Sequence, residues 1–386
     1  MQIPSFIILS NWFSELFSGV NKYVPIDIKM LLIISAVFLS LSVIFFNYIL
    51  TSRVIKTRRE KREHKLKKKF ELLITTVIFD EAELVGEKLK QRERLLDHFK
   101  KNYLKTAEAR QLLIDEILNL YKGFTGQPSR TLRQLYLSLH LYTDSIRKLK
   151  DPRWHIKTKG VKELSTLEAK QGYSRIYRLI NHSNSILRME AQLALVKMMD
   201  FQALTFLDDT RYPISEWQQI NLLEVMASLD RKMTLPDLGK WLHSSNETVT
   251  IFTLKMISYF SLLDLTKPVI KMLNHPSLKV RKAVVKTLGD LDTASALSLL
   301  KKRFYNFEKD FKLAVIDVST KIAIEKDFPF LELQLLSEDR DISQATAYAL
   351  ASNSDSGKEL LRGIYASYAD EKLKGMIRNA LNEPTL

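Results

Sequence analysis

Two stretches of this 386-residue chain are similar to one another: LNHPSLKVRKAVVKTLGDL at 273–291 and INHSNSILRMEAQLALVKM at 180–198. They begin 93 positions apart, which is three times 31. Each has a turn rich in Asn, His and Ser, followed by apolar residues at helical spacing. A period of about 31 residues is typical of helical repeats, in which each unit buries its apolar face against its neighbours.

The same interval recurs along much of the chain. An apolar helix position returns as Leu164, Leu195, Met226, Ile257 and Leu288, and then near Val318 and Leu350. A position beside the turn returns as Leu149, Ile180, Leu242, Leu273, Phe304 and Leu335, with Arg211 breaking the series. We therefore expect an all-α fold, an α-solenoid of about seven hairpins over residues 140–365. Each hairpin would be a short helix, a turn and a second amphipathic helix.

One motif carries a resemblance to a known family. Leu187-Arg188, with Ala191 and Leu195 following, matches Val280-Arg281 with Val284 and Leu288. This pattern resembles the HEAT-like repeats, specifically the short kind also found in PBS lyases. The resemblance implies a solenoid. It implies no particular activity, because such repeats serve scaffolds, adaptors and a few enzymes.

A second feature is the run MLLIISAVFLSLSVIFFNYIL at Met30–Leu50, which contains no charged residue. As a helix it would span roughly 31 Å, close to the hydrocarbon thickness of a bilayer. The run is too long for a signal peptide, and no cleavage site follows it. A buried core helix is the alternative. We expect a transmembrane anchor in the inner or plasma membrane.

Charge sets the expected orientation of this anchor. Two Lys precede the run, whereas ten Lys and Arg follow it directly, and residues 51–69 carry +8 of the chain's net charge of +15. The positive-inside rule then places the N-terminus outside and the C-terminal body in the cytoplasm. We expect these cations to set topology and to bind lipid headgroups. They are Arg53, Lys56, Arg58, Arg59, Lys61, Arg62, Lys65, Lys67, Lys68 and Lys69.

The expected domain organisation follows from these two features. Residues 1–29 form a short non-cytoplasmic segment, in which Asn11–Val20 would lie in the outer interface or be a disordered end. Residues 30–50 are the transmembrane helix, and 51–69 the basic juxtamembrane segment. Residues 70–139 are expected to be a helical cap, and 140–386 the repeat array with its own C-terminal cap. Low Gly and Pro content, 11 and 10 residues, also favours helices over sheet.

One set of residues is a candidate binding site. Cations recur two positions before the turn residue, so repeat stacking would align them in a basic ladder on the surface of the second helices. An acidic partner is the functional interpretation, and an ordinary solvated face is the alternative. Lys255 and Lys286, on the other helix, are expected to tolerate charge reversal. The ladder consists of Arg147, Arg178, Lys240, Lys271 and Lys302.

Other chemistry finds little support in the sequence. The chain has no Cys, and it contains no phosphate-binding, dinucleotide or zinc-protease motif. His182 and His275 share one turn position, where helix capping explains them better than metal binding. We therefore expect no enzyme activity, no cofactor and no metal.

The leading hypothesis is a membrane-anchored scaffold or adaptor that holds a protein partner at the cytoplasmic face. An integral-membrane enzyme or a secretion component is the kind of partner we expect. A PBS-lyase-like enzyme is one alternative, because the repeats look alike. A HEAT-like nucleic-acid-binding protein is another, although the anchor and the modest charge of the array outside residues 51–69 argue against nucleic acid.

Overall fold

The computed structural model describes residues 26–79, 87–229, 234–291 and 294–382. These residues form helices joined by turns, with no β-strand among them, which confirms the expected all-α fold. Contacts divide the chain between Leu135 and Tyr136, four residues before the boundary predicted from the sequence. The segment Asn11–Val20 lies outside the described residues.

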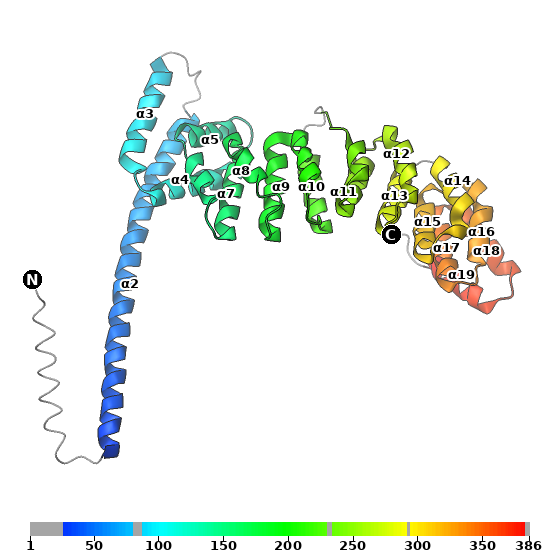
Figure 1. The fold of residues 1–386 in the computed structure, drawn as a ribbon, viewed down its shortest axis with the longest axis horizontal. Coiled ribbons are helices and arrows are strands. Elements are labelled where there is room, and N and C mark those ends of the chain that lie inside the picture. The colour runs from blue at the N-terminus through cyan, green and yellow to red at the C-terminus, as the bar shows by residue number, and fades with distance from the viewer. Residues whose placement is uncertain (1–25, 80–86, 230–233, 292–293, 383–386) are drawn as a thin grey trace, which may run out of the picture. The chain divides into compact units, whose positions relative to one another are not determined.

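The most prominent element of the first unit is α2 (Ile26–Phe79), one continuous helix of 54 residues. Figure 1 shows its length beside the shorter helices. The apolar run Met30–Leu50 lies within it, and none of the side chains in that run is buried against the protein. A core helix of a soluble protein would bury them. The run is therefore a candidate membrane span, and a buried core helix does not describe it.

The end of α2 that follows the basic segment packs on two further helices, α3 (Glu87–Tyr103) and α4 (Ala107–Tyr121). Phe70 and Ile74 of α2 are buried, as are Leu113 and Ile117 of α4. The ring of Phe70 lies 5.8 Å from that of Phe99 in α3. The apolar stripes of this region therefore form a small core. α5 (Gln127–Ser138) follows and contains the division between the units.

The second unit is a series of helical hairpins, visible in Figure 1 as a row of helices. In its described residues, eight second helices begin at intervals of 31 residues. This constant interval confirms the repeat period expected from the sequence. These helices are α7 (Trp154–Thr166), α9 (Ser185–Met199), α10 (Glu216–Ala227), α11 (Glu247–Tyr259), α13 (Leu278–Asp290), α15 (Lys309–Ile322), α17 (Arg340–Asn353) and α19 (Glu371–Asn382).

The first helices of the hairpins are shorter and partly of the 3₁₀ type. They are α6 (Tyr142–Lys148), η1 (Lys170–Gly172) with α8 (Tyr173–Tyr177), η2 (Asp200–Asp209), η3 (Leu238–His243), η4 (Leu263–Leu265) with α12 (Thr266–Lys271) and η5 (Met272–Asn274), α14 (Ala294–Arg303) with η6 (Phe304–Asn306), η7 (Glu325–Asp327) with α16 (Phe328–Leu335), and α18 (Asp355–Ser367). The pair α18–α19, expected only as a cap, keeps the repeat register. α19 buries Leu373 and Ile377 and exposes Arg378 and Asn379, as the end of a solenoid requires.

The core of this unit lies between stacked second helices. Consecutive members such as α7 and α9, α11 and α13, and α15 and α17 pack on one another. All positions of the predicted apolar series are buried, which confirms the register. The buried positions are Leu164, Leu195, Met226, Ile257, Leu288, Val318 and Leu350.

The Arg of the repeat motif stabilises the turn that precedes its helix. Nη1 of Arg188 donates to the carbonyl oxygens of His182 and Ser183, at 2.7 and 3.3 Å. Arg281 donates in the same way to His275 and Pro276, at 3.0 Å each. The motif therefore has a structural role, since it satisfies carbonyl groups that the turn leaves unpaired.

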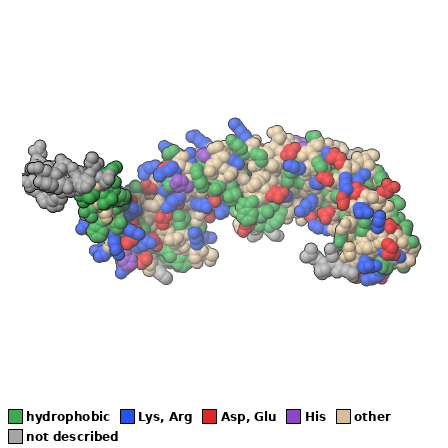
Figure 2. All heavy atoms as spheres, turned by 90° about the horizontal axis from the view of Figure 1, so that it is seen from below, with side chains coloured by type: hydrophobic (Ala, Val, Ile, Leu, Met, Phe, Trp, Pro, Cys, Tyr) green, Lys and Arg blue, Asp and Glu red, His purple; other side chains and the backbone are tan. Residues whose placement is uncertain are grey.

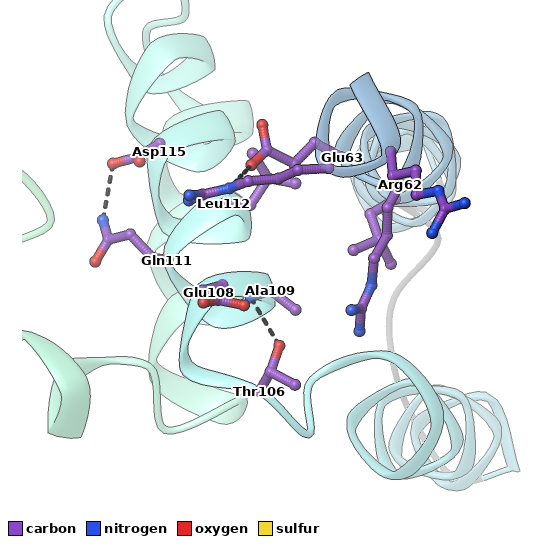
Figure 3. A pocket seen from close by; sticks show the side chains of 11 residues that line it. Arg62, Glu63, Thr106, Glu108, Ala109, Gln111, Leu112 and Asp115 are labelled. Atoms are coloured by element: carbon purple, nitrogen blue, oxygen red, sulfur yellow. Dashed lines mark hydrogen bonds and ion pairs between the residues drawn. The ribbon is translucent and has the colours of Figure 1, made fainter. Parts of the chain in front are cut away.

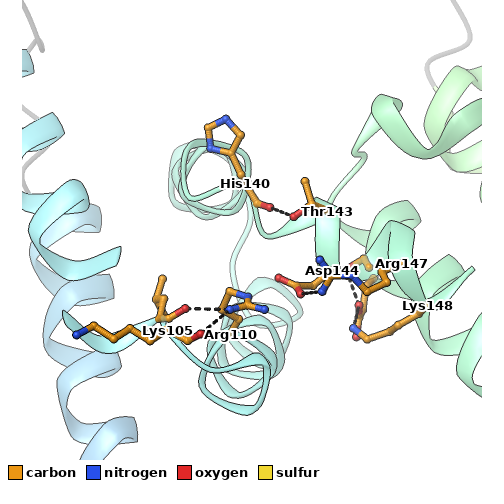
Figure 4. Close-up of polar contacts among 10 residues, drawn as sticks. Lys105, Arg110, His140, Thr143, Asp144, Arg147 and Lys148 are labelled. Carbon is orange, nitrogen blue, oxygen red and sulfur yellow. Dashed lines mark hydrogen bonds and ion pairs between the residues drawn. The ribbon is translucent and has the colours of Figure 1, made fainter. Parts of the chain in front are cut away.

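The same contact recurs in the first unit, where sequence comparison did not find it. Arg110 of α4 donates to the carbonyl oxygens of Leu104 and Lys105, at 3.1 and 3.2 Å (Figure 4). Its partners lie six and five residues before it, as in the two repeat motifs. The region expected to be a divergent cap therefore contains a turn of the repeat type.

The third hairpin is the irregular one. Its first helix, η2, is a 3₁₀ helix of ten residues, and an extended loop replaces the usual turn. Asn181 holds this loop from one side by donating to the carbonyl oxygen of Asp209 and accepting from the amide of Arg211. Asn246 holds it from the other side by donating to the carbonyl oxygens of Thr210 and Tyr212. This hairpin is the one in which Arg211 breaks the sequence pattern.

Candidate partner-binding surface

The five ladder residues lie on the first helices or at their ends, and not on the second helices as expected. Arg147 is in α6, Lys240 in η3, Lys271 in α12 and Lys302 in α14, while Arg178 directly follows α8. The sequence pattern placed both the turn and these residues correctly, but residues that precede the turn belong to the first helix of the hairpin and not to the second. All five side chains are exposed.

Two ladder residues have carboxylate partners within the chain. Arg147 donates to Asp144 at 2.8 Å in the same helix (Figure 4). Lys240 contacts Asp208 at 2.9 Å, and its ammonium lies 4.6 Å from the ring of Trp241. Exposed pairs of this kind contribute little to stability, but each reduces the charge available to a partner. The ladder is therefore less continuous as a basic surface than the sequence suggested.

The exposed face of the second helices presents a more strongly patterned surface. Positions two, five and nine of these helices are three and four residues apart, so they lie along one face. Because the helices begin at a constant interval, equivalent positions lie side by side in the array. Position two reads His155, Ile186, Trp217, Thr248, Lys279, Asp310, Asp341 and Lys372 along the eight helices.

Apolar side chains occupy this face in α9, in α10 and in the loop before α10. Trp217 is 66 % exposed, Ile220 53 %, Ile186 46 % and Tyr212 42 %. The Tyr212 ring lies against the guanidinium of Arg188, 4.4 Å from its centre, which fixes the ring at the surface. Figure 2 shows a group of hydrophobic side chains near the middle of the array. We call Ile186, Tyr212, Trp217 and Ile220 the apolar patch.

Lysines occupy the same face in the next helices of the array. Lys255 is at position nine of α11, and Lys279 and Lys286 are at positions two and nine of α13. Burial lowers the pKa of Lys255, Glu216 of α10 opposes that effect, and Lys286 adds a smaller lowering. Among the described residues, Lys279 and Lys286 have no ion-pair partner. These three residues are the lysine group. Two of them were expected to lie away from the binding surface.

Carboxylates occupy this face in the next two second helices, α15 and α17. Asp310 and Asp341 hold position two of α15 and α17. Asp310 contacts Lys282 at 3.3 Å, and Asp341 contacts Lys309 at 2.6 Å. The acidic part is thus largely paired within the chain, whereas the apolar patch and the lysine group are open to a partner.

The basic segment of α2 has a mixed role in the first unit. Lys67 contacts Glu116 of α4 at 2.6 Å, and the Glu116 carboxylate raises the pKa of Lys67. Lys69 donates to the Tyr103 hydroxyl at 2.9 Å. Both lysines therefore fasten α2 to the helices beside it. Eight of the ten cations lie on α2 without such a tertiary contact among the described residues.

A cleft of about 500 Å³ lies between α2 and α4 in this unit (Figure 3). Arg58, Arg59 and Arg62 line one side, and Thr106, Glu108 and Asp115 are among the residues that line the other. Arg59 is paired with Glu63 at 2.9 Å. Basic and acidic residues balance in the lining, so the cleft has no strong preference for an anion or a cation.

The histidines of the turns serve as hydrogen-bond acceptors. Nδ1 of His182 lies 3.1 Å from the amide of Asn184, and Nδ1 of His275 lies 3.1 Å from that of Ser277. Burial, with help from Lys157 and Arg188, lowers the pKa of His182. Within the described residues, no three His, Asp or Glu side chains gather as metal ligands.

Comparison with known proteins supports the repeat assignment. Residues 235–318, from before η3 into α15, match the family model described as HEAT repeats. The same register extends through all eight hairpins of the described array. The chain is therefore a helical-repeat protein with HEAT-like repeats. No curated protein matches it.

Three solved structures are among those similar to the chain. YibA of Escherichia coli is 14 % identical over 70 % of this chain and 97 % of its own, with a TM-score of 0.35. Human deoxyhypusine hydroxylase in complex with glycerol is 13 % identical over 75 % and 96 %, with a TM-score of 0.27. The CpcE–CpcF complex of phycocyanin lyase from Nostoc is 12 % identical over 81 % and 93 %, with a TM-score of 0.25. At these values none of the three bears on the function of this chain.

Proposed function

We propose that the protein is a membrane-anchored scaffold, and not an enzyme, whose repeat array holds a protein partner at the cytoplasmic face. The exposed apolar patch is the observation that carries this proposal. Tyr and Trp at the centre of a surface are the residues that most often anchor a protein interface. A soluble array gains nothing from displaying them to water, since each costs hydrophobic free energy while it stays exposed.

The membrane anchor rests on α2. Met30–Leu50 is a run of twenty-one residues without a charge, and no other described part of the protein covers its side chains. Such a run needs an apolar environment. The cations that follow on the same helix favour the orientation with the array in the cytoplasm. Tethering a partner to this array would raise its concentration near the membrane without any further contact.

Geometry limits which cations can reach lipid. The headgroup region extends only about 5 to 8 Å beyond the hydrocarbon on each side. Along an upright helix, Arg53 lies about 5 Å past Leu50 and Lys56 about 9 Å, whereas Lys69 lies about 28 Å past it. We propose that Arg53 contacts headgroups directly, and that Lys56 and Arg58 reach them because their long side chains point back towards the helix N-terminus. The later cations contribute to topology and to the fold of the first unit.

Three experiments on the full chain in membranes test the proposal. A reporter fused after Leu386 is expected to behave as cytoplasmic, and the chain is expected to resist carbonate extraction. Extraction of the intact chain by carbonate would refute the anchor. Chemical cross-linking followed by a pull-down is expected to recover a protein partner from wild type, and to lose it from a Trp217→Asp, Ile220→Asp variant.

A control variant has matched exposure. Leu263 and Leu333 are each 61 % exposed but lie in first helices, so Leu263→Asp with Leu333→Asp is expected to keep the partner. The ladder is tested with Lys271→Glu and Lys302→Glu. Lys240 is left unchanged, because Lys240→Glu would place a second carboxylate beside that of Asp208. Loss of the partner from the ladder variant alone would assign the interface to the ladder.

A further inference from the structure

The apolar patch and the lysine group lie on one face, which constrains what can bind there. Ile186 and Trp217 hold the same position in consecutive helices that pack on each other. Lys279 holds that position two helices further on. A ligand that follows this row therefore meets apolar side chains first and ammonium groups afterwards.

The length of this row can be worked out from helix packing. Neighbouring packed helices lie about 8 to 10 Å apart. From α9 to α13 there are three steps, and because α10 packs less closely on α11 than on α9, the row spans at least about 24 to 30 Å. A helix rises about 1.5 Å per residue, so a partner helix of at least about 16 to 20 residues would cover this distance.

The secondary structure of the partner segment also follows from the surface. Among the described residues there is no strand, and so no sheet edge to which an extended peptide could add. The alternative mode is an amphipathic helix that lays its apolar face across the repeat helices. Such a helix presents apolar residues at intervals of three and four, which suits a compact patch of Ile, Tyr and Trp side chains.

Resting on the scaffold function proposed above, we infer that the partner segment is an acidic amphipathic helix of at least about 16 to 20 residues. Its apolar residues contact Ile186, Trp217 and Ile220 on α9 and α10. Its carboxylates, gathered towards one end, contact Lys279 and Lys286 on α13. Charge complementarity fixes the direction in which the helix lies along the array.

Site-specific photo-cross-linking in membranes identifies the segment that contacts each site. A photoreactive residue replaces Ile220 in the apolar patch, Lys279 in the lysine group, or Lys271 in the ladder as a comparison. The expected result is one partner segment, cross-linked through its apolar part at position 220 and through its acidic part at position 279. Mass spectrometry of the cross-linked peptides reads both contacts directly.

A synthetic peptide of that segment then provides a binding measurement with the full chain in detergent. Lys279→Glu with Lys286→Glu is expected to weaken binding by about 30-fold or more, because like charges then face each other. A peptide with its acidic residues changed to Lys is expected to recover affinity for this variant and to lose it for wild type. Lys267→Glu with Lys326→Glu, two exposed changes in first helices, is the charge-matched control.

Several outcomes would overturn the inference. These are a cross-linked segment without clustered acidic residues, an adduct with lipid or with a second copy of this chain, or failure of the charge swap to restore binding. A partner cross-linked only at position 271 would overturn it and leave the scaffold function standing. Absence of a protein adduct at all three positions would overturn both.

Discussion

Two glycines in one helix offer a sharp test of how the hairpins pack. Gly357 and Gly363 both lie in α18. A Cβ added at Gly357 would lie 2.3 Å from the carbonyl oxygen of Leu350 and 3.2 Å from its carbonyl carbon, both backbone atoms. A Cβ added at Gly363 would meet nothing within 4 Å. The same Gly→Ala change is therefore expected to have opposite effects at the two positions.

The magnitudes follow from these distances. Ala gains roughly 0.5 to 1 kcal/mol over Gly in a helix, and Gly363→Ala is expected to show that stabilisation. At Gly357 the backbone of α17 cannot rotate away as a side chain would. α18 must therefore move from Leu350, which is fully buried, and overpacking of this kind costs about 1 to 3 kcal/mol. Gly357→Ala is thus expected to be destabilising on balance.

Hydrogen exchange of the full chain in detergent is the suitable assay. A repeat array is stabilised mainly by contacts between neighbouring hairpins, so a single melting temperature does not report a local change well. Amides of α17, α18 and α19 are expected to exchange faster in Gly357→Ala and slower in Gly363→Ala. Equal exchange in the two variants, or faster exchange spread evenly over the array, would refute the packing described here.

Three further predictions concern single side chains. Leu195→Asp buries an unpaired charge and is expected to cost several kcal/mol, lowering the helical signal in circular dichroism, whereas Lys197→Asp, exposed on the same helix, is expected to change stability by less than about 0.5 kcal/mol. Trp217→Ala removes roughly 100 Å² of exposed apolar surface, so partner affinity is expected to fall about 70-fold while the unfolding transition stays unchanged. The pKa of His182 is lowered in the folded chain, so the unfolded chain binds this proton more readily and stability is expected to fall as the pH drops below about 6.5. His182→Gln is expected to reduce that acid-dependent loss in urea titrations; an unchanged pH dependence would contradict it.

The sequence predicted the fold because the 31-residue interval reflects which positions of each hairpin are buried. Every repeat must place an apolar residue between stacked helices, so Leu195 and Leu288 recur at a fixed interval and are found fully buried. The candidate membrane span at Met30–Leu50 could also be predicted from the sequence, because its length and its lack of charged residues are visible there. The turn of the repeat type at Arg110 was missed, because it does not continue the interval of 31 residues.

The candidate surface could be predicted only in part. The basic ladder was found because cations stand out in a sequence, but periodicity alone does not tell which helix of a hairpin a residue near the turn belongs to. The apolar patch was missed because an exposed Trp217 and a buried Trp241 look the same in the sequence. Reading position two of each second helix at the repeat interval could have found it, once the helix starts were known.

The irregular third hairpin has a mechanical consequence. A membrane-anchored array that binds a partner would be under tension whenever the partner is pulled away from the membrane. In a solenoid this tension passes from one hairpin to the next. α10 packs closely on α9 but less closely on α11. Hydrogen bonds from Asn246, which precedes α11, to the loop before α10 help to join the two hairpins. Under tension the array is expected to extend first at the junction between α10 and α11. In the proposed scaffold, a partner helix lying from α9 to α13 would cross this junction, so the array with the partner bound is expected to be stiffer than the free array.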